Sequence, residues 1–233
     1  MKTVLAFETS SPVLSVALGT RKGTVREIHS PGLLQHSENL IPLIDQLLRK
    51  EKIPLNQIDA FAIDRGPGSF TGLRIGFSLM RGFLAVKKRP CYGALSLDMI
   101  ASNVRLSEGS HLGVLVDARR DALYARFYRC QRGEWKAERK LELLSFNELK
   151  ARIREGASLV GDALIRYREE LQEAFDQRIH FLQTDLSFPS AAALVKWFQA
   201  KDTRLTPLKT PQDFLPLYFR APEAEEKKSR KKN

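Results

Sequence analysis

Residues 64–76 read Asp-Arg-Gly-Pro-Gly-Ser-Phe-Thr-Gly-Leu-Arg-Ile-Gly. They follow an apolar run at 58–63 that predicts a buried strand, and they precede apolar residues with helical spacing at 73–84. We therefore expect a glycine-rich loop that joins a strand to a helix. Ser69 or Thr71 can cap that helix, and the glycines permit positive φ and close approach of another backbone.

Such a junction can bind an anion, because backbone N–H groups and the positive end of the helix point to one spot. The residues that would form this nucleotide or anion loop are Gly66, Gly68, Ser69, Thr71, Gly72 and Arg74. A tight turn with a capped helix and no ligand explains the same pattern equally well. The stretch lacks the Gly-Lys-Ser/Thr ending of a Walker loop and does not follow Gly-x-Gly-x-x-Gly.

The composition is typical of a globular protein, with 43% hydrophobic and 28% charged residues among 233. No apolar run approaches the roughly 18 residues that span a bilayer. The first residues lack the features of a signal peptide, because Glu8 interrupts the apolar run. We therefore expect a cytoplasmic protein with no membrane association. The two cysteines and four histidines show no metal-type spacing, so no metal site is predicted.

The formal net charge is +11, of which residues 223–233 supply +2. A basic surface favours polyanions such as nucleic acid, or acidic partners. Basic residues that serve solubility explain the charge equally well. No aromatic-plus-basic pattern of a known RNA-binding module is present.

The order of predicted elements is βββαβα and then begins again. Three strands joined by short turns occupy 3–29 and predict an antiparallel meander, followed by a helix from Ser37, a strand at 58–63 and a helix to Val86. A second apolar strand that ends in a carboxylate follows from Val114. The pairs Glu8 and Asp117, Leu14 and Leu123, and Leu18 and Phe127 are each 109 residues apart.

The sequence thus predicts an α/β protein of two related lobes. The first lobe covers 1–106, the second covers 107–222, and a charged tail at 223–233 is expected to be disordered.

Several segments occur in an order that resembles one bacterial protein family, the TsaB (YeaZ) family. They are Phe7–Ser10, His36–Asp45, Gly66–Gly76, Leu95–Leu97 and Pro216–Arg220. The resemblance covers almost the whole chain. It implies the two-lobed actin-like (ASKHA, ribonuclease H-like) fold with a repeated βββαβα core.

The resemblance also implies a function. Members of the family support formation of N6-threonylcarbamoyladenosine (t6A) at adenosine 37 of tRNA. The chain would be a non-catalytic partner of the TsaD enzyme, on which the TsaE ATPase docks, and it would meet tRNA through that complex. ATP or ADP would bind at the complex interface, with no cofactor intrinsic to the chain. A homodimer is the alternative for the isolated chain.

Two substitutions argue against independent catalysis. The TsaD branch carries a His-x-x-x-His pair on its first helix, whereas here His36 is followed four residues later by Leu40. A single imidazole without a second nearby ligand is a poor metal site. Glu8 also stands where aspartate is commonest in the family. We therefore expect no catalytic residues and no independent activity.

The resemblance implies that the first two helices form a helical dimer interface. The candidate residues are Leu40, Ile44, Leu47, Ile75, Leu79 and Phe83. The sequence does not determine which sides of these helices face inward. Gly72, Gly76 and Gly82 would permit close approach of helices.

Three alternatives stay open. The first is an active phosphotransferase of the same fold, with Glu8, Asp117 and the glycine loop around Mg-ATP, although 118–121 is not glycine-rich. The second is a peptidase-like protein, although no Ser–His–Asp or His-Glu-x-x-His pattern is present. The third is an RNA-binding module, which the basic charge permits.

Overall fold

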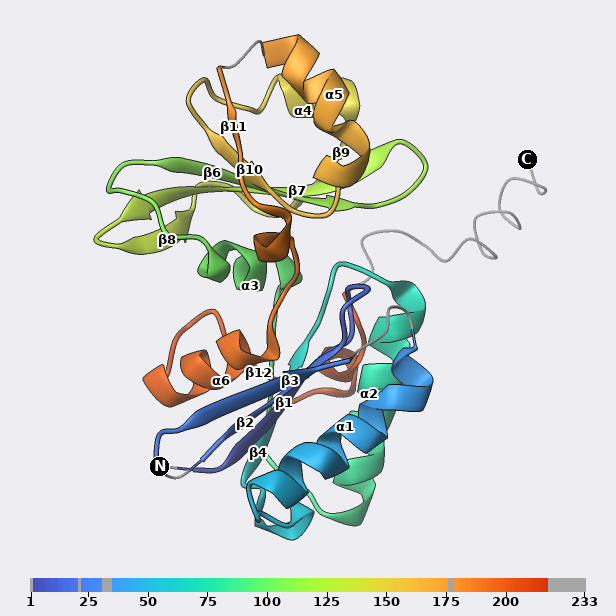
Figure 1. The fold of residues 1–233 in the computed structure, drawn as a ribbon. Coiled ribbons are helices and arrows are strands. Elements are labelled where there is room, and N and C mark those ends of the chain that lie inside the picture. The colour runs from blue at the N-terminus through green and yellow to red at the C-terminus, as the bar shows by residue number, and fades with distance from the viewer. Residues whose placement is uncertain (1, 21, 31–34, 176–177, 218–233) are drawn as a thin grey trace, which may run out of the picture.

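The computed structural model describes residues 2–20, 22–30, 35–175 and 178–217. Two sheets lie one above the other, each at the centre of one lobe (Figure 1). The lower sheet has the strand order β12-β5-β4-β1-β2-β3. Its strands are β1 (Val4–Glu8), β2 (Ser15–Gly19), β3 (Val25–His29), β4 (Ala60–Asp64), β5 (Cys91–Ala94) and β12 (Thr206–Pro207).

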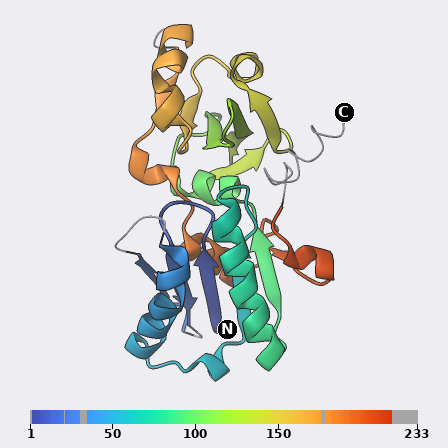
Figure 2. The same ribbon diagram turned by 90° about the vertical axis from the view of Figure 1, so that its right-hand side faces the viewer.

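The predicted meander and parallel strand are confirmed in this lower sheet. Strands β1, β2 and β3 are antiparallel, and β4 and β5 run parallel to β1. Every residue of β1 is buried because helices cover both faces. Leu5 and Phe7 belong to the core beneath α1 (His36–Lys50) and α2 (Phe70–Val86). Figure 2 shows these two helices side by side on one face.

The upper sheet repeats this topology. Its order is β11-β10-β6-β7-β8, which matches β5-β4-β1-β2-β3, and β9 also pairs with β7. The elements are β6 (His111–Asp117), β7 (Ala122–Gln131), β8 (Glu134–Ala137), β9 (Glu142–Ser145), α4 (Phe146–Lys150), β10 (Ser158–Val160), α5 (Leu164–Phe175) and β11 (His180–Phe181). The predicted repeat of a βββαβα core is therefore confirmed.

The repeat is not kept at one constant offset. Glu8 pairs with Ser15 across the first hairpin, whereas Asp117 pairs with Leu123 across the second. The second turn is one residue shorter, so the offset of 109 does not describe both strands of the hairpin.

The chain returns to the lower sheet after the second lobe. Helix α6 (Ala191–Ala200) packs on the face opposite α1 and α2, and β12 pairs with β5. Both segments lie in the range 107–222 that the sequence analysis assigns to the second lobe. That face is lined with alanines, among them Ala17 and Ala60, and a helix that begins with three alanines can approach it closely. The carboxylate of Glu27 accepts hydrogen bonds from Ser190 Oγ at 2.9 Å and Ala192 N at 3.0 Å, which anchors the start of α6.

Helix α3 (Ser96–Asn103) lies between the two lobes (Figure 1). Its Asp98 accepts hydrogen bonds from Arg126 Nη1 at 2.9 Å and Tyr128 Oη at 2.7 Å, both on β7. Trp135 Nε1 donates to the carbonyl of Val104 at 3.0 Å. Buried polar bonds of this kind hold α3 and the upper sheet in one arrangement, because breaking them leaves a buried charge unpaired.

Short 3-10 helices complete the described chain: η1 (Leu55–Gln57), η2 (Thr184–Ser187) and η3 (Pro211–Phe214). In the ranges that the structure describes, no helix combines the length and the apolar character needed to cross a membrane. The predicted tail at 223–233, and Tyr218–Arg220 of the closing motif, lie outside the described residues.

Candidate functional site

The glycine-rich stretch is the strand–loop–helix junction that the sequence predicts. Asp64 ends β4, and Ser69 caps α2 by accepting a hydrogen bond from Gly72 N at 3.2 Å. Asp64 Oδ1 accepts hydrogen bonds from Gly66 N at 2.7 Å and from Ser96 Oγ at 2.8 Å. The buried carboxylate thus fixes the start of the loop, while Ser69 fixes its end.

Three glycines of this loop and helix face the turn between β1 and β2. A Cβ atom on Gly68 would lie 2.4 Å from the carbonyl oxygen of Ser10, and one on Gly72 would lie 2.0 Å from that of Thr9. A Cβ atom on Gly76 would lie 2.6 Å from Thr9 Oγ1. These glycines therefore bring α2 against the β1–β2 turn. Gly72 and Gly76 thus serve contact with this turn where the sequence predicts close approach of a helix, and Gly82 faces open space.

The carbonyl of Ser10 also uses a donor of the loop. Ser69 N donates to this oxygen at 2.6 Å. The backbone of the protein itself thus accepts from one N–H group that a bound anion would otherwise contact. The role of Gly66, Gly68, Ser69, Thr71, Gly72 and Arg74 toward a nucleotide or anion stays a prediction.

Two carboxyl groups share one hydroxyl beneath the loop. Glu8 and Asp64 are both 0% exposed. Ser10 Oγ lies 2.7 Å from Glu8 Oε1 and 2.6 Å from Asp64 Oδ2. A serine hydroxyl has one hydrogen and can donate to only one of these oxygens. The second contact therefore needs a proton carried by a carboxyl group.

Glu8 is the group that carries this proton at neutral pH. Burial, and then repulsion by Asp64, raise the pKa of Glu8 to about 8. Burial raises the pKa of Asp64 to about 6, and hydrogen bonds from Ser10, Gly66 and Ser96 oppose that rise. The pair holds one negative charge where two would repel each other.

His36 connects α1 to the same turn. Its buried Nε2 lies 2.8 Å from the carbonyl oxygen of Ser11, to which it can donate. Ser11 in turn donates from N and from Oγ to Glu8, both at 3.0 Å. The turn at 9–11 therefore contacts the start of both helices and fixes their relative positions. Across the described residues, no three His, Cys, Asp or Glu side chains cluster as a metal site would need.

A groove of about 490 Å³ runs between α1 and α2. It is lined by Ser37, Leu40, Ile41, Phe70, Thr71, Arg74, Ile75, Ser78 and Leu79. Ile41 is 60% exposed, while Ile75 and Leu79 are half-buried. The guanidinium of Arg74 lies 3.9 Å from the centre of the Phe70 ring. The groove brings residues of the predicted anion loop beside residues of the predicted interface.

The predicted interface needs a correction on α1. Leu40, Ile44 and Leu47 are only 1%, 4% and 1% exposed, because this stripe of the helix packs on its own sheet. On α2, Phe83 is half-buried and stacks on Phe61 with ring centroids 5.3 Å apart. Ile41 is not among the interface residues predicted from the sequence. Its apolar side chain lies outside the apolar stripe that the helical spacing defines on α1. An apolar residue outside the core-facing stripe of a helix is the sequence feature that could have indicated this exposed position.

The turn after β6 in the second lobe, which corresponds to the β1–β2 turn of the first lobe, is built differently. Asp117 ends β6, and its N–H donates to Asp162 Oδ1 at 2.9 Å. Burial raises the pKa of Asp162 to about 6. In the turn that follows, Arg119, Arg120 and Asp121 have positive φ of 61°, 52° and 56°, where glycine would be favoured.

A sequence model of one protein family, described as TsaD, tRNA N6-adenosine threonylcarbamoyltransferase, matches residues 32–228. The chain belongs to this family. Similar proteins are called tRNA threonylcarbamoyladenosine biosynthesis protein TsaB. The protein of Haemophilus influenzae is 34% identical over 123 residues, which is 52% of each chain. The protein of Escherichia coli is 31% identical over 58% of this chain and 59% of its own.

The alignments thus span little more than half the length of these two relatives. A TsaB protein of Buchnera aphidicola subsp. Baizongia pistaciae is 25% identical over 208 residues, which cover 86% of this chain and 90% of that protein. The predicted resemblance to the TsaB (YeaZ) family is confirmed.

Two solved structures from Pseudomonas aeruginosa have the same fold. One, described as an uncharacterized protein with similarity to peptidase YEAZ, has a TM-score of 0.75 at 26% identity and covers 94% of this chain and 100% of its own. The other, YeaZ, has a TM-score of 0.72 at 24% identity, with the same coverage. Together with the repeated sheet topology, they confirm the predicted α/β fold of two related lobes.

Proposed function

We propose that this chain is a non-catalytic partner of a TsaD enzyme in the formation of t6A at adenosine 37 of tRNA, in the cytoplasm. Membership of the TsaD family supports the pathway. The observation that carries the partner role is the exposed groove between α1 and α2. Isolated exposed apolar residues are normal, but an apolar groove with Ile41 at 60% exposure beside Ile75 and Leu79 is typical of an interaction surface.

The occupant that we propose for the groove is TsaD. The turn at 9–11 fixes both helices from below, so the groove is held ready before the partner binds, which lowers the entropic cost of association. A second copy of this chain is the alternative occupant when the partner is absent.

A nucleotide at the same complex interface is part of the proposal. Thr71 and Arg74 line the groove and belong to the predicted anion loop. ATP or ADP held there would contact both proteins, and the TsaE ATPase and the tRNA would join the assembled complex. The chain itself would then need no catalytic group.

Reconstitution tests this function. Purified TsaD, TsaE, the synthase that makes threonylcarbamoyl-adenylate, and unmodified tRNA are combined with and without this chain, and t6A is measured after nuclease digestion. We expect t6A only when the chain is present. Full modification in its absence would contradict the proposal, as would t6A formation by the chain without TsaD.

A further inference from the structure

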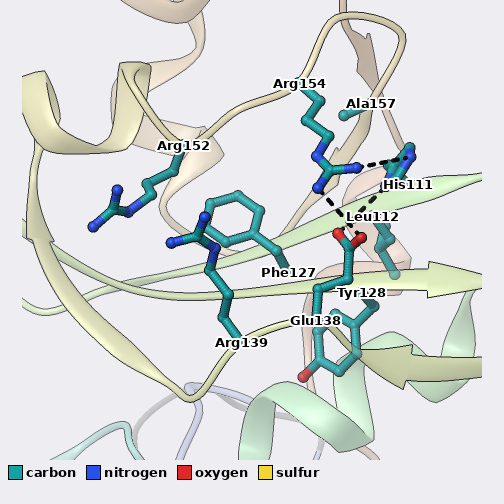
Figure 3. Close-up of a pocket in the computed structure, with 9 residues that line it drawn as sticks. All are labelled: His111, Leu112, Phe127, Tyr128, Glu138, Arg139, Arg152, Arg154 and Ala157. Atoms are coloured by element: carbon teal, nitrogen blue, oxygen red, sulfur yellow. Dashed lines mark hydrogen bonds and ion pairs between the residues drawn. The ribbon is translucent and has the colours of Figure 1, made fainter.

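A second, smaller pocket is lined only by residues of the upper lobe (Figure 3). The start of β6, the middle of β7, the segment after β8 and the segment between α4 and β10 surround it. Its lining residues are His111, Leu112, Phe127, Tyr128, Glu138, Arg139, Arg152, Arg154 and Ala157. Its volume of about 30 Å³ is the space of a few water molecules and suits one small group, not a whole nucleotide.

Positive charge exceeds negative charge in this pocket. Arg154 lies 3.5 Å from Glu138 Oε1, and Arg152 lies 3.4 Å from Glu142 Oε1. Strong charge-assisted hydrogen bonds measure about 2.7–2.9 Å, so these guanidinium groups are weakly paired. Arg139 has no ion-pair or hydrogen-bond partner for its guanidinium among the described residues.

The backbone that carries these side chains is held by hydrogen bonds. Glu138 N donates to the carbonyl of Phe127 at 2.9 Å, and Arg152 N donates to that of Leu149 at 2.9 Å. Ala157 N donates to the carbonyl of Arg154 at 3.1 Å. The three arginines therefore come from anchored segments.

The floor of the pocket is apolar, and the carboxylate of Glu138 forms part of its wall. Phe127 is 8% exposed and Leu112 is 1% exposed. Glu138 Oε2 lies 3.3 Å from His111 Nδ1, so Glu138 holds His111 and Arg154 on one side of the pocket. Figure 3 shows Arg154 directed toward His111 and Glu138. An apolar floor lowers the local dielectric and strengthens the attraction of these cations for an anion.

We propose that this pocket binds a phosphate group. The planar fork of a guanidinium matches phosphate oxygens in a bidentate way, and Arg139 and Arg154 line this small space. Arg152 also lines it, with its guanidinium directed away from Arg154 (Figure 3). The segment 126–154, which supplies most of the lining residues, contains nine basic and four acidic residues and so carries a net positive charge. The phosphate can come from a free polyphosphate or from an RNA backbone. The site does not depend on the partner role of α1 and α2.

Titration of the full chain tests this site with two probes, tripolyphosphate and a labelled single-stranded RNA of twelve nucleotides. The variant is Arg139→Gln, whose side chain is exposed, and the matched control is Arg132→Gln, which removes the same charge from the β7–β8 turn outside the pocket. We expect Arg139→Gln to weaken binding of at least one probe by tenfold or more and Arg132→Gln to weaken it less than twofold. Arg139→Lys keeps the charge without the fork and should give an intermediate loss.

The two probes distinguish the sources of the phosphate. Binding of tripolyphosphate without RNA indicates a free polyphosphate, whereas binding of RNA that tripolyphosphate displaces indicates a backbone phosphate, and both support the site. Equal losses in Arg139→Gln and Arg132→Gln, or no saturable binding of either probe, would overturn it. A melting temperature of each variant close to wild type excludes unfolding as the cause.

Discussion

The two junctions that follow the first strand of each lobe occupy the same place in a repeated topology, yet their chemistry differs. In the lower lobe Glu8 is fully buried, shares Ser10 with Asp64 and lies under the glycine loop. In the upper lobe the side chain of Asp117 is 15% exposed and that of the neighbouring Arg119 is 86% exposed. The carboxyl group that ends the first strand is therefore shielded from solvent in the lower lobe and partly exposed in the upper lobe.

One device is common to both junctions. A Cβ atom on Gly161 would lie 1.9 Å from the carbonyl oxygen of Leu115, much as one on Gly72 would lie 2.0 Å from that of Thr9. In each lobe a glycine after the second parallel strand allows close approach to the first strand or its turn. Both lobes therefore place a glycine where a side chain would meet backbone, while the buried acid pair belongs to the lobe that bears the groove.

The largest expected effect on stability comes from Gly72→Ala. Its methyl group would overlap a backbone carbonyl that cannot move without shifting the turn, so we expect a loss of about 3 kcal/mol, or a melting temperature lower by roughly 6–12 °C. Thermal unfolding measures it. Gly82→Ala is the control, because open space surrounds Gly82 and alanine favours a helix by roughly 0.5–1 kcal/mol. Equal losses at both positions would refute the close contact with Thr9.

Glu8→Gln should change how stability depends on pH. The pKa of Glu8 is about 8 in the folded chain and near 4.5 when unfolded, so the folded state holds an extra proton between these values. Stability therefore falls as pH rises through this window, by at most about 1.4 kcal/mol per pH unit. Denaturant unfolding from pH 5 to pH 8.5 should show a shallower decline in Glu8→Gln than in wild type. Parallel curves would mean that Glu8 is already ionised in the folded chain.

Asp162→Asn, in the upper lobe, should change the pH dependence of stability in the same sense as Glu8→Gln but by a smaller amount. The pKa of Asp162 is about 6 when folded and near 3.8 when unfolded, so its contribution to stability declines only as pH rises between these values. We expect the variant to differ in slope from wild type below about pH 6 and to run parallel above pH 7. A change in slope at pH 7–8 would erase the contrast between the two junctions.

The sequence was sufficient for the parts of the fold that local pattern specifies. The apolar strands, the glycine loop and the Ser69 cap depend on neighbouring residues, and these predictions are confirmed. The helical spacing of α1 identifies one apolar stripe but not which surface covers it. Leu40, Ile44 and Leu47 are therefore candidates for the interface by sequence, whereas the structure places them in the core.

Features that depend on distant contacts could not be predicted. Ser10 bridges Glu8 and Asp64 across 54 residues, and α6 crosses back to the lower sheet because that face needs an apolar cover. The phosphate pocket joins His111 to Arg154 over 43 residues. No local sequence pattern predicts contacts between residues so far apart in the chain.

The most direct measurement compares two exposed isoleucines, one in each lobe, for binding to TsaD. Ile41 on α1 is 60% exposed in the groove, and Ile165 on α5 is 71% exposed outside it. Arginine at either position should leave the fold intact, which a melting temperature checks. Phe83 is unsuitable for this test, because it stacks on Phe61 and its replacement would also disturb the core. Size-exclusion chromatography with light scattering should show a complex for wild type and Ile165→Arg and none for Ile41→Arg. An Ile41→Arg chain that binds TsaD as wild type does would contradict the account.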